Sequence, residues 1–474
     1  MFLNPIKIMS TVKAKQILPF ILLVAVAIIA MFIKPAADYV PGATETQYSS
    51  SDIAWVLVST ALVFLMTPGL AFFYGGMVNR KNVISTMIKS VVAAGIVGVL
   101  WIVCGFSLAF GESINGLIGN PTTFAFYNGV KSGAPWAGAP TIPLTLFSLF
   151  QLMFAIITPG LVVGAVAERI RFTSYVLFIV LFVFLVYAPV AHWSWHPEGF
   201  LAKMGAWDFA GGTVVHITAG CAALAGALVL KRRKSHLANK EIPPANVPYV
   251  LIGTGLLWFG WFGFNAGSAL GANGLAVNAL GTTSTAASAA GLAWMFFDVL
   301  KGKKPSVLGF CIGAVVGLVA ITPAAGYVGI PQSIIIGLVG ALVSNIAVGI
   351  KQRSKVDDML DVFPCHGLGG MVGMLLTGVF ASTAVHGIAG GPNGLFYGNP
   401  AFFFTQLKAM GIVAAYSFIV SYGIFKFINF VAPIRVSEKD EEEGLDASQH
   451  NEKYLQGTLL VHNNGILEEK SVEI

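Results

Sequence analysis

Two histidines stand in segments that are otherwise apolar: His216 follows Thr-Val-Val, and His366 follows Phe-Pro-Cys. An ionisable side chain at membrane depth is costly, so it indicates a functional role by default. A neutral imidazole both donates and accepts a hydrogen bond, and it titrates near neutral pH. A pair in contact could therefore pass a proton along a narrow, dry path, although a single buried histidine is more often a packing residue.

Aromatic side chains are the second group with possible chemistry. Trp195, Phe150 and Phe154 lie in segments that could reach the outer half of a pore, and a dense cluster broken by glycine fills 258–265. Aromatic faces attract a partly dehydrated cation, and a hydroxyl such as Ser268 could accept a hydrogen bond from it. Most of these aromatics are expected to face lipid or to pack, and periodicity does not tell which ones line a pore.

A metal site is the alternative use of histidine in this chain. His192 and His196 have helical i,i+4 spacing next to Glu198, but the prediction places them in an outer loop, and no H-E-x-x-H motif occurs. The buried pair, His216 and His366, has no third ligand nearby and would make an incomplete zinc site. We therefore expect no metal, no cofactor and no enzymatic activity. The four cysteines all fall in apolar segments and read as small buried hydrophobes: Cys104, Cys221, Cys311 and Cys365.

The composition shows what must position these residues. Of 474 residues, 56% are apolar and only 11% are charged, against about 25% charged in a typical soluble domain. A run of about 20 apolar residues is what a helix needs to cross the hydrocarbon layer, and helices satisfy their own backbone in lipid. The sequence predicts an all-α membrane protein. Its net charge of +6 is spread over several loops, so we expect no nucleic-acid partner.

After the N-terminal segment, about eleven transmembrane spans are predicted. They lie near 53–77, 88–110, 143–167, 174–191, 212–230, 248–270, 276–299, 307–325, 333–350, 365–385 and 404–430. Basic residues follow every second span: Arg80, Lys81, Arg169, Arg171, 231–234, Lys301, Lys303, Lys304, Lys351, Arg353 and Lys355. The other loops hold few, with Lys131 and Lys203 as exceptions. By the positive-inside rule the chain runs N-out and C-in.

Two short matches indicate an internal repeat. The motif Ile-Thr-Pro-Gly at 157–160 recurs as Ile-Thr-Pro-Ala at 321–324, and Asp208 and Asp358 each stand eight residues before a histidine. The matched spans are five apart, which inverts their direction, so the pattern predicts a five-plus-five inverted repeat plus a final helix. In such transporters the substrate path lies between the halves. Chance in glycine- and proline-rich helices is the alternative.

The two ends of the chain differ from its centre. Lys7, Lys13 and Lys15 precede the apolar run 17–33, which favours a signal peptide over an uncleaved anchor, although no clean cleavage site follows. We divide the chain into this segment (1–43), a transmembrane domain (44–434) and a cytoplasmic tail (435–474). The tail is acidic, as either a solvated extension or a docking surface would be.

Several segments together resemble the Amt/Mep/Rh ammonium transporter family, and bacterial Amt proteins most closely. They are FFYGGMV at 72–78, GAVAERI at 164–170, DFAGGTVVH at 208–216, GWFGFNAGS at 260–268 and DVFPCHG at 361–367. They run in the family's order from about residue 52 to about 450. The Pro364-Cys365 pair is a small local variation in the last segment, which affects little beyond pore packing.

The resemblance implies a role for each matched residue. Trp195, Phe154 and Ser268 would form an outer ammonium site, supported by Asp208 without direct contact to substrate. Phe154 and Phe264 would be stacked gate rings, and His216 and His366 the twin pore histidines. It further implies a homotrimer with one pore per subunit in the bacterial inner membrane. The element at 441–446 would be a regulatory one, on the side that receives a PII-type signalling protein in bacterial members.

The expected function is ammonium transport across the membrane. Ammonium and potassium ions are alike in size and charge, but ammonium donates directed hydrogen bonds and can lose a proton. Ammonium would be deprotonated at the outer site, and ammonia would cross an apolar pore while the histidines relay the proton. The rival functions are a Rh-like conduit for neutral gas, an ammonium sensor that signals through the tail, and a sodium-coupled transporter. The last is weakest, because no acidic ion site is evident.

Overall fold

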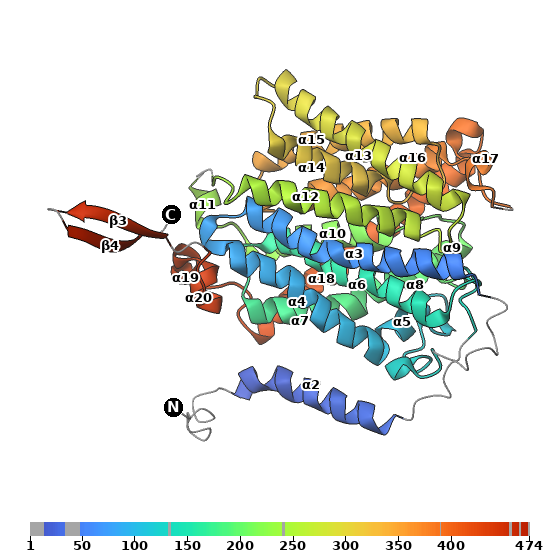
Figure 1. The fold of residues 1–474 in the computed structure, drawn as a ribbon. Helices are drawn as coiled ribbons and strands as arrows, with labels where there is room; N and C mark the ends of the chain where they lie inside the picture. The colour runs from blue at the N-terminus through green and yellow to red at the C-terminus, as the bar shows by residue number, and fades with distance from the viewer. Residues whose placement is uncertain are drawn as a thin grey trace.

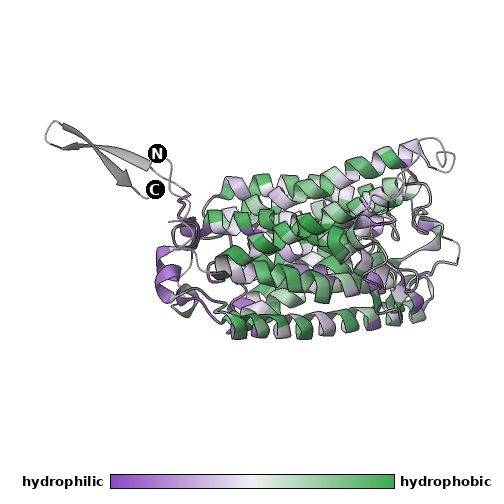
Figure 2. Ribbon diagram, turned by 90° about the horizontal axis from the view of Figure 1, so that it is seen from below, coloured by the Kyte–Doolittle hydropathy of each residue, from purple (hydrophilic) through white to green (hydrophobic). Residues whose placement is uncertain are grey.

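A computed structural model describes residues 14–33, 48–130, 134–238, 242–388, 390–454, 457–463 and 466–472. Long helices lie side by side in one bundle (Figure 1). Hydrophobic residues cover the length of the bundle, and hydrophilic residues gather at its two ends (Figure 2). This distribution is what a lipid environment imposes, because charged groups are excluded from the hydrocarbon layer and collect on either side of it.

Long helices occupy all of the predicted spans. In the first part of the chain they are α3 (Ser50–Met77), α4 (Val83–Leu100) with η3 (Trp101–Gly105) and α5 (Phe106–Phe110), α6 (Leu144–Val166), α7 (Phe172–Phe182) with η5 (Val183–Tyr187) and α8 (Ala188–Trp195), and η6 (Gly212–Ile217) with α10 (Thr218–Leu230). In the second part they are α12 (Val247–Trp261) with η7 (Phe262–Ala266), α13 (Gly274–Leu300), α14 (Val307–Ile321), α15 (Ile330–Gln352), η8 (Phe363–Leu368) with α16 (Gly369–Phe380), and α18 (Pro400–Val431).

Within the described residues, nine of these helical stretches are long and apolar enough to cross a membrane. The remaining two predicted spans, 276–299 and 307–325, are helical as α13 and α14, but neither is among the nine. The prediction of a multi-pass helical membrane protein is confirmed, and the described part of the chain is predominantly helical, with four short strands outside the long helices. The number of eleven crossings stays a prediction.

Short elements connect the long helices. At one end of the bundle lie α9 (Phe200–Lys203) and α17 (Thr383–His386), and at the other lie α11 (Lys234–Leu237), α19 (Glu438–Glu443) and α20 (Leu445–His450) (Figure 1). We call these the α9 end and the α19 end. The remaining short elements are β1 (Ser113–Ile114), paired antiparallel with β2 (Ile118–Gly119), η2 (Arg80–Asn82), η4 (Ala125–Tyr127) and η9 (Leu395–Tyr397).

The terminal elements lie outside the bundle. Helix α2 (Ala14–Phe32) contains most of the apolar run of the predicted signal segment. The residues between this run and the predicted boundary at 43, where a cleavage site would lie, are outside the described residues. At the other terminus β3 (Gly457–Asn463) and β4 (Ile466–Val472) form an antiparallel hairpin that extends beyond the α19 end (Figure 1).

The centre of the bundle is built from α6 and α10, where almost every side chain is buried. Glycine allows the closest helix contact there. A Cβ atom added to Gly220 of α10 would stand only 2.2 Å from the backbone nitrogen of Gly367 in η8. Because neither residue has a side chain, the two histidine-bearing helices can pack backbone to backbone.

Candidate functional site

The structure brings His216 and His366 together in the middle of the bundle. Their Nδ1 atoms lie 3.3 Å apart, although 150 residues separate them in the sequence. The side chains are 1% and 4% exposed. At this distance one imidazole can donate a hydrogen bond to the other. The Nε2 atom of His216 has no hydrogen-bond partner among the described residues, so it can still bind another donor or acceptor.

Both histidines lie in short π-helical segments, η6 and η8. Such segments shift the helical register and occur frequently at functional sites. In η6 the wider turn is visible in the hydrogen bond from His216 N to Gly211 O, a backbone bond that spans five residues. Gly211 itself has φ +116°, a left-handed conformation that side chains rarely adopt. The start of this helix therefore depends on glycine.

An aspartate caps each histidine-bearing helix. The Asp208 carboxylate accepts hydrogen bonds from the backbone nitrogens of Gly211 (2.9 Å), Gly212 (2.7 Å), Thr213 (2.7 Å) and Val214 (3.4 Å), and from the Thr213 hydroxyl. Asp358 accepts from Val362 N (3.0 Å) and Phe363 N (2.7 Å). The equal spacing seen in the sequence thus reflects one structural device, a charged cap at a helix N-terminus.

At the α9 end, a cavity of about 310 Å³ contains all four residues expected at the outer site: Phe154, Trp195, Asp208 and Ser268. We call this cavity the vestibule. The rings of Phe154 and Trp195 are 5.8 Å apart and nearly perpendicular. The indole nitrogen of Trp195 donates to the backbone oxygen of Asp208 (3.0 Å), which fixes the ring. Ser268 Oγ donates to Phe264 O (2.8 Å), so its lone pairs remain free to accept.

Phe154 and Phe264 separate the vestibule from the interior. Their ring centroids are 4.4 Å apart, with the planes inclined by 47°. The rings expected to be stacked are therefore in contact but tilted. Phe150 also packs against Phe154, with ring centroids 4.9 Å apart. Together these contacts hold Phe154 in place, and opening a path requires the rings to move.

Below the two phenylalanines lies a small cavity of about 10 Å³, which we call the lumen. It is lined by His216, His366 and apolar or aromatic side chains: Met66, Leu70, Phe73, Ile157, Leu161, Val215, Leu257, Trp261, Phe264 and Val315. This volume is near the minimum that admits one water molecule. A third cavity of about 350 Å³ opens at the α19 end and shares Phe73, Val315 and His366 with the lumen. The three cavities therefore lie in series through the bundle.

Trp261 is a neighbour of the lumen that sequence reasoning did not single out. Its ring stacks on the His216 ring, with centroids 5.5 Å apart and planes inclined by 19°. Its indole nitrogen donates to the hydroxyl of Thr322 (2.9 Å), within the repeated Ile-Thr-Pro motif. The aromatic cluster at 258–265 was the available signal, but no periodicity identified this member of it.

Charged residues at the α19 end form a buried network. Arg233 lies 2.6 Å from the Glu168 carboxylate and 2.9 Å from that of Asp357. Burial alone would raise the pKa of Asp357, but the hydrogen bonds and charges of Arg233 and Arg169 outweigh it and hold the pKa well below its usual range. For the next residue, Asp358, burial dominates and raises the pKa to about 6, with Asp361 adding to the effect and Lys351 opposing it.

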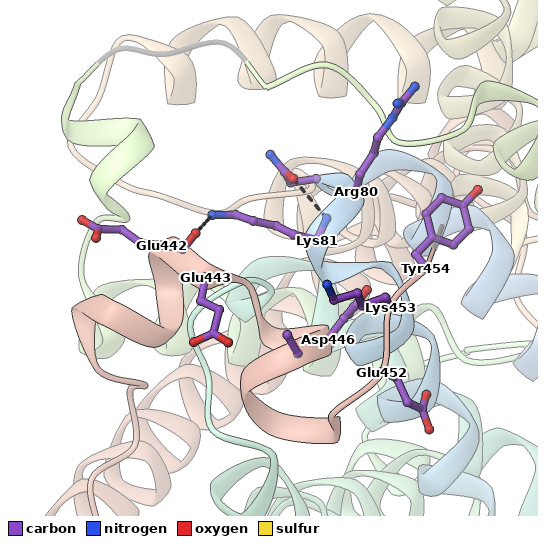
Figure 3. Close-up of a pocket in the computed structure, with 10 residues that line it drawn as sticks. Arg80, Lys81, Glu442, Glu443, Asp446, Glu452, Lys453 and Tyr454 are labelled. Atoms are coloured by element: carbon purple, nitrogen blue, oxygen red, sulfur yellow. Dashed lines mark hydrogen bonds between the residues drawn. The ribbon is translucent and has the colours of Figure 1, made fainter. Parts of the chain in front are cut away.

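The tail packs onto this end of the bundle. Glu441 accepts from the backbone nitrogen of Lys234 (2.8 Å) and from the Arg435 guanidinium (2.6 Å). Asp446 accepts from Ser85 N (2.7 Å) at the start of α4, and Lys81 Nζ donates to Glu442 O (2.5 Å). Figure 3 shows Lys81 reaching this carbonyl at the rim of a cavity of about 440 Å³. Residues 435–454 thus include a docked segment, and the alternative of a purely solvated extension is wrong for them.

The prediction that His192 lies in a loop is wrong, because it belongs to the last turn of α8. The η5–α8 helix continues further than the apolar run suggested. Both ring nitrogens of His192 have partners, Ser113 Oγ at 2.8 Å and Ala109 O at 3.0 Å. Its ring stacks on that of His196 at 4.3 Å. These contacts tie α8 to the end of α5 and to β1.

Comparison with known proteins identifies what the chain is similar to. A family model described as Ammonium Transporter Family matches residues 54–454. A putative ammonium transporter of Methanothermobacter thermautotrophicus is 47% identical over 407 residues, which cover 85% of this chain and 98% of that protein. The ammonium transporter Amt1 of Archaeoglobus fulgidus is 44% identical over 404 residues, covering 85% and 99%.

Solved structures agree with the sequence comparison. The crystal structure of Candida albicans Mep2 superposes with a TM-score of 0.79 at 35% identity, covering 83% of this chain and 88% of that one. A structure described as a sensor Amt protein superposes with a TM-score of 0.77 at 29% identity, covering 84% and 98%. Residues 54–454, which the family model matches, include the helices that carry both histidines and the residues that line the vestibule.

Proposed function

The chain belongs to the ammonium transporter family and is a multi-pass membrane transporter, and from this premise we propose how its residues move ammonium. An ammonium ion enters the vestibule and binds at Phe154, Trp195 and Ser268. Aromatic faces stabilise a partly dehydrated cation, and the free lone pairs of Ser268 Oγ accept one of its N–H groups. Asp208 keeps Trp195 and the start of η6 in place and does not touch the ion.

Deprotonation follows from the size and polarity of the lumen. A bare ion is expensive in a cavity of about 10 Å³ with mainly apolar walls, because an unpaired charge in low dielectric costs many kcal/mol. Ammonium therefore gives up its proton near the gate formed by Phe154 and Phe264. Ammonia crosses the lumen, and the His216–His366 pair relays the proton towards the α19 end. Potassium has no proton to lose and is excluded.

The orientation in the membrane follows from charge. Basic residues gather at the α19 end, so that end is cytoplasmic and the vestibule opens outside. The eleven helical stretches then cross N-out and C-in. Residues 44–434 form the transporter domain as a five-plus-five inverted repeat plus α18. One observation supports the repeat, the matched aspartate caps of the two histidine-bearing helices.

The remaining assignments rest on family membership. We place the protein in the inner membrane of a bacterium, as a homotrimer with one pore per subunit and with 1–43 as a signal segment. The tail from 435 is regulatory, and the cytoplasmic face is where a PII-type protein would bind. Its α19 and α20 helices already contact α4 and α11, so a cytoplasmic partner would meet a docked tail.

One observation carries the proposal: the 3.3 Å contact of His216 with His366, between the gate and the inner cavity. The test is transient current in liposomes that contain the purified protein, with ammonium as the substrate and potassium as the control ion. Wild-type protein should give an ammonium-specific current. His216→Leu should reduce it at least tenfold, about 1.4 kcal/mol in the barrier, and admit potassium.

His236→Leu is the matched control, because that histidine sits on α11 beside Arg232 and away from the lumen. It should behave as wild type. Unchanged ammonium selectivity after both His216 and His366 are replaced by leucine would refute the relay. A pH change inside the liposomes on adding ammonia, without current, would replace the proposal by a neutral gas pathway.

A sensor is the second candidate, favoured by the similarity to the sensor Amt structure and by the docked tail. A sensor would bind ammonium at the vestibule and change the tail contacts with little flux. Ammonium binding to the purified protein with neither current nor internal pH change would favour this function over transport.

A further inference from the structure

The vestibule is much larger than the ion it is proposed to bind. Its volume is about 310 Å³, whereas a cavity of about 10–15 Å³, measured in the same way, admits one water molecule, which is similar in size to ammonium. Phe154, Trp195 and Ser268 occupy only part of the wall. Further out, the same cavity is lined by Trp136, Phe147 and Gln151.

Phe147, Gln151 and Phe154 form one stripe along α6. Their spacing of four and three residues places them on the same face of the helix, and all three line the vestibule. At 1.5 Å per residue, Gln151 lies about 4.5 Å outward from Phe154, and Phe147 lies about 6 Å further out. Trp136 stacks on Phe147, with centroids 5.2 Å apart and planes inclined by 11°. The entrance is thus ordered: an aromatic wall, then an amide, then the gate.

Gln151 is the unusual member of this stripe. Its side chain is 8% exposed, and its carbonyl oxygen has no hydrogen-bond partner among the residues that the structure describes. Buried polar atoms in proteins are nearly always paired, so an exception calls for an explanation. By contrast, both amide atoms of the buried Gln406 are paired, with the backbone of Trp207. Gln151 lines the cavity proposed to receive ammonium. Once its side chain turns the carbonyl oxygen towards that cavity, an N–H donor from a ligand is the natural partner.

We propose that the vestibule contains a second cation subsite, at Gln151 and the Trp136–Phe147 wall, which binds primary alkylammonium ions. The ammonium head donates to the Gln151 carbonyl, and the alkyl chain packs against the Trp136 ring. The inference rests on the proposed function, since it requires the vestibule to be the entrance for ammonium.

An alkylammonium ion is expected to bind in the vestibule without being transported. Phe154 and Phe264 close the inner side with centroids 4.4 Å apart, and the lumen beyond has only about 10 Å³. A chain of two to five carbons does not fit there. Alkylammonium ions therefore occupy the vestibule, block the way to the gate and compete with ammonium.

The test measures inhibition of ammonium current by ethyl-, propyl-, butyl- and pentylammonium in liposomes. Each added methylene that packs on the wall should lower the inhibition constant about two- to fourfold. Trp136→Leu should flatten this dependence on chain length. Gln151→Met, similar in size but without the amide, should raise every inhibition constant about tenfold and leave the dependence unchanged. Trp258→Leu is the control, since Trp258 does not line the vestibule.

Tetramethylammonium separates the two parts of the subsite, because it has charge but no N–H donor. Its inhibition constant should be the same in wild type and Gln151→Met. Three outcomes would overturn the subsite and leave the proposed function standing. They are a normal ammonium current that alkylammonium ions do not inhibit, inhibition that does not depend on chain length, and a current carried by pentylammonium. If wild type carries no ammonium current, the proposed function fails. Quenching of tryptophan fluorescence by pentylammonium, compared between wild type and Trp136→Leu, then decides the subsite separately.

Discussion

Two units of the molecule share one design: an aspartate, a helix that begins with a π-helical segment, and a histidine eight residues after the aspartate. In the Asp208 unit, the carboxylate accepts hydrogen bonds from five donors in the segment that follows it. In the Asp358 unit it holds two backbone nitrogens, and charged neighbours surround it. The two units therefore have their histidine at the same position relative to the aspartate, but the two aspartate caps are stabilised differently.

The difference matches the two ends of the bundle. The Asp208 unit borders the aromatic vestibule, where few charges are present and the cap must satisfy its helix alone. The Asp358 unit follows directly after Asp357, which is bound to Arg233 and through it to Glu168. Lys351 contributes a further bond, 2.7 Å to the backbone oxygen of Asp358. The first unit is self-contained, and the second depends on a network that also reaches the tail through Lys234 and Glu441.

The largest expected effect comes from removing the self-contained cap. Asp208→Ala leaves the nitrogens of Gly211, Gly212 and Thr213 without an acceptor in a segment that is almost completely buried. Each buried, unpaired donor costs about 1–3 kcal/mol. We expect a loss of about 5 kcal/mol in the free energy of unfolding, measured by titration with sodium dodecyl sulfate in mixed micelles.

Asp358→Ala is the matched variant and should lose only about 2 kcal/mol, since two donors are left unpaired and a buried charge is also removed. Asp208→Asn, which keeps one acceptor oxygen, should fall between wild type and Asp208→Ala. Equal losses for the two alanine variants would show that the caps do not differ in the way the hydrogen bonds indicate.

An intermediate effect should come from the network behind the second unit. Arg233→Ala leaves Glu168 and Asp357 buried without their common partner, and breaking a buried ion pair costs about 3–5 kcal/mol. We expect about 3 kcal/mol in the same titration, because the side chain of Arg233 retains some exposure. Arg232→Ala, whose guanidinium binds His236 as its one partner among the described residues, should lose less than about 0.5 kcal/mol. A loss as small as this for Arg233→Ala would show that the network does not stabilise the Asp358 unit.

The sequence predicted where the helices lie better than which side chains contact one another. Long apolar runs leave helix as the main option in lipid, so each predicted range contains one, and the charge-poor composition already indicated the class. Trp261 shows the limit. Helix α12 is apolar on all sides, so hydropathy could not show that this ring faces His216, and the π-helical η7 that follows changes the register again.

Long-range contacts were also out of reach. Asp446 binds the start of α4 across 361 positions of sequence. Composition alone left the tail undecided between a solvated extension and a docking surface for a partner, and it did not indicate contacts with the bundle itself. The two histidines were different, because their matched spacing from an aspartate gave a reason to pair them. A repeated motif carries three-dimensional information that a single residue such as Gln151 does not.

The smallest expected effect is a pH dependence confined to the second unit. Burial raises the pKa of Asp358 from 3.8 to about 6. The folded protein therefore holds this proton more tightly than the unfolded chain, so the contribution to stability is full below pH 3.8 and is lost as the pH rises through about 6. Asp358→Asn, which stays neutral, should gain on wild type between pH 4 and 6.5 by on the order of 1–2 kcal/mol and then run parallel to it.

The neighbouring carboxylate makes this comparison sharper. Burial also raises the pKa of Asp361, and its charge adds to the shift of Asp358. In Asp361→Asn the loss of stability attributed to Asp358 should therefore move to lower pH and shrink. Midpoints of thermal unfolding at half-unit steps of pH, for wild type and both variants in one detergent, measure this. If the curves of wild type and Asp358→Asn stay parallel from pH 4 to 7, the Asp358 carboxylate is already ionised throughout that range, and the second cap then works as a charged one.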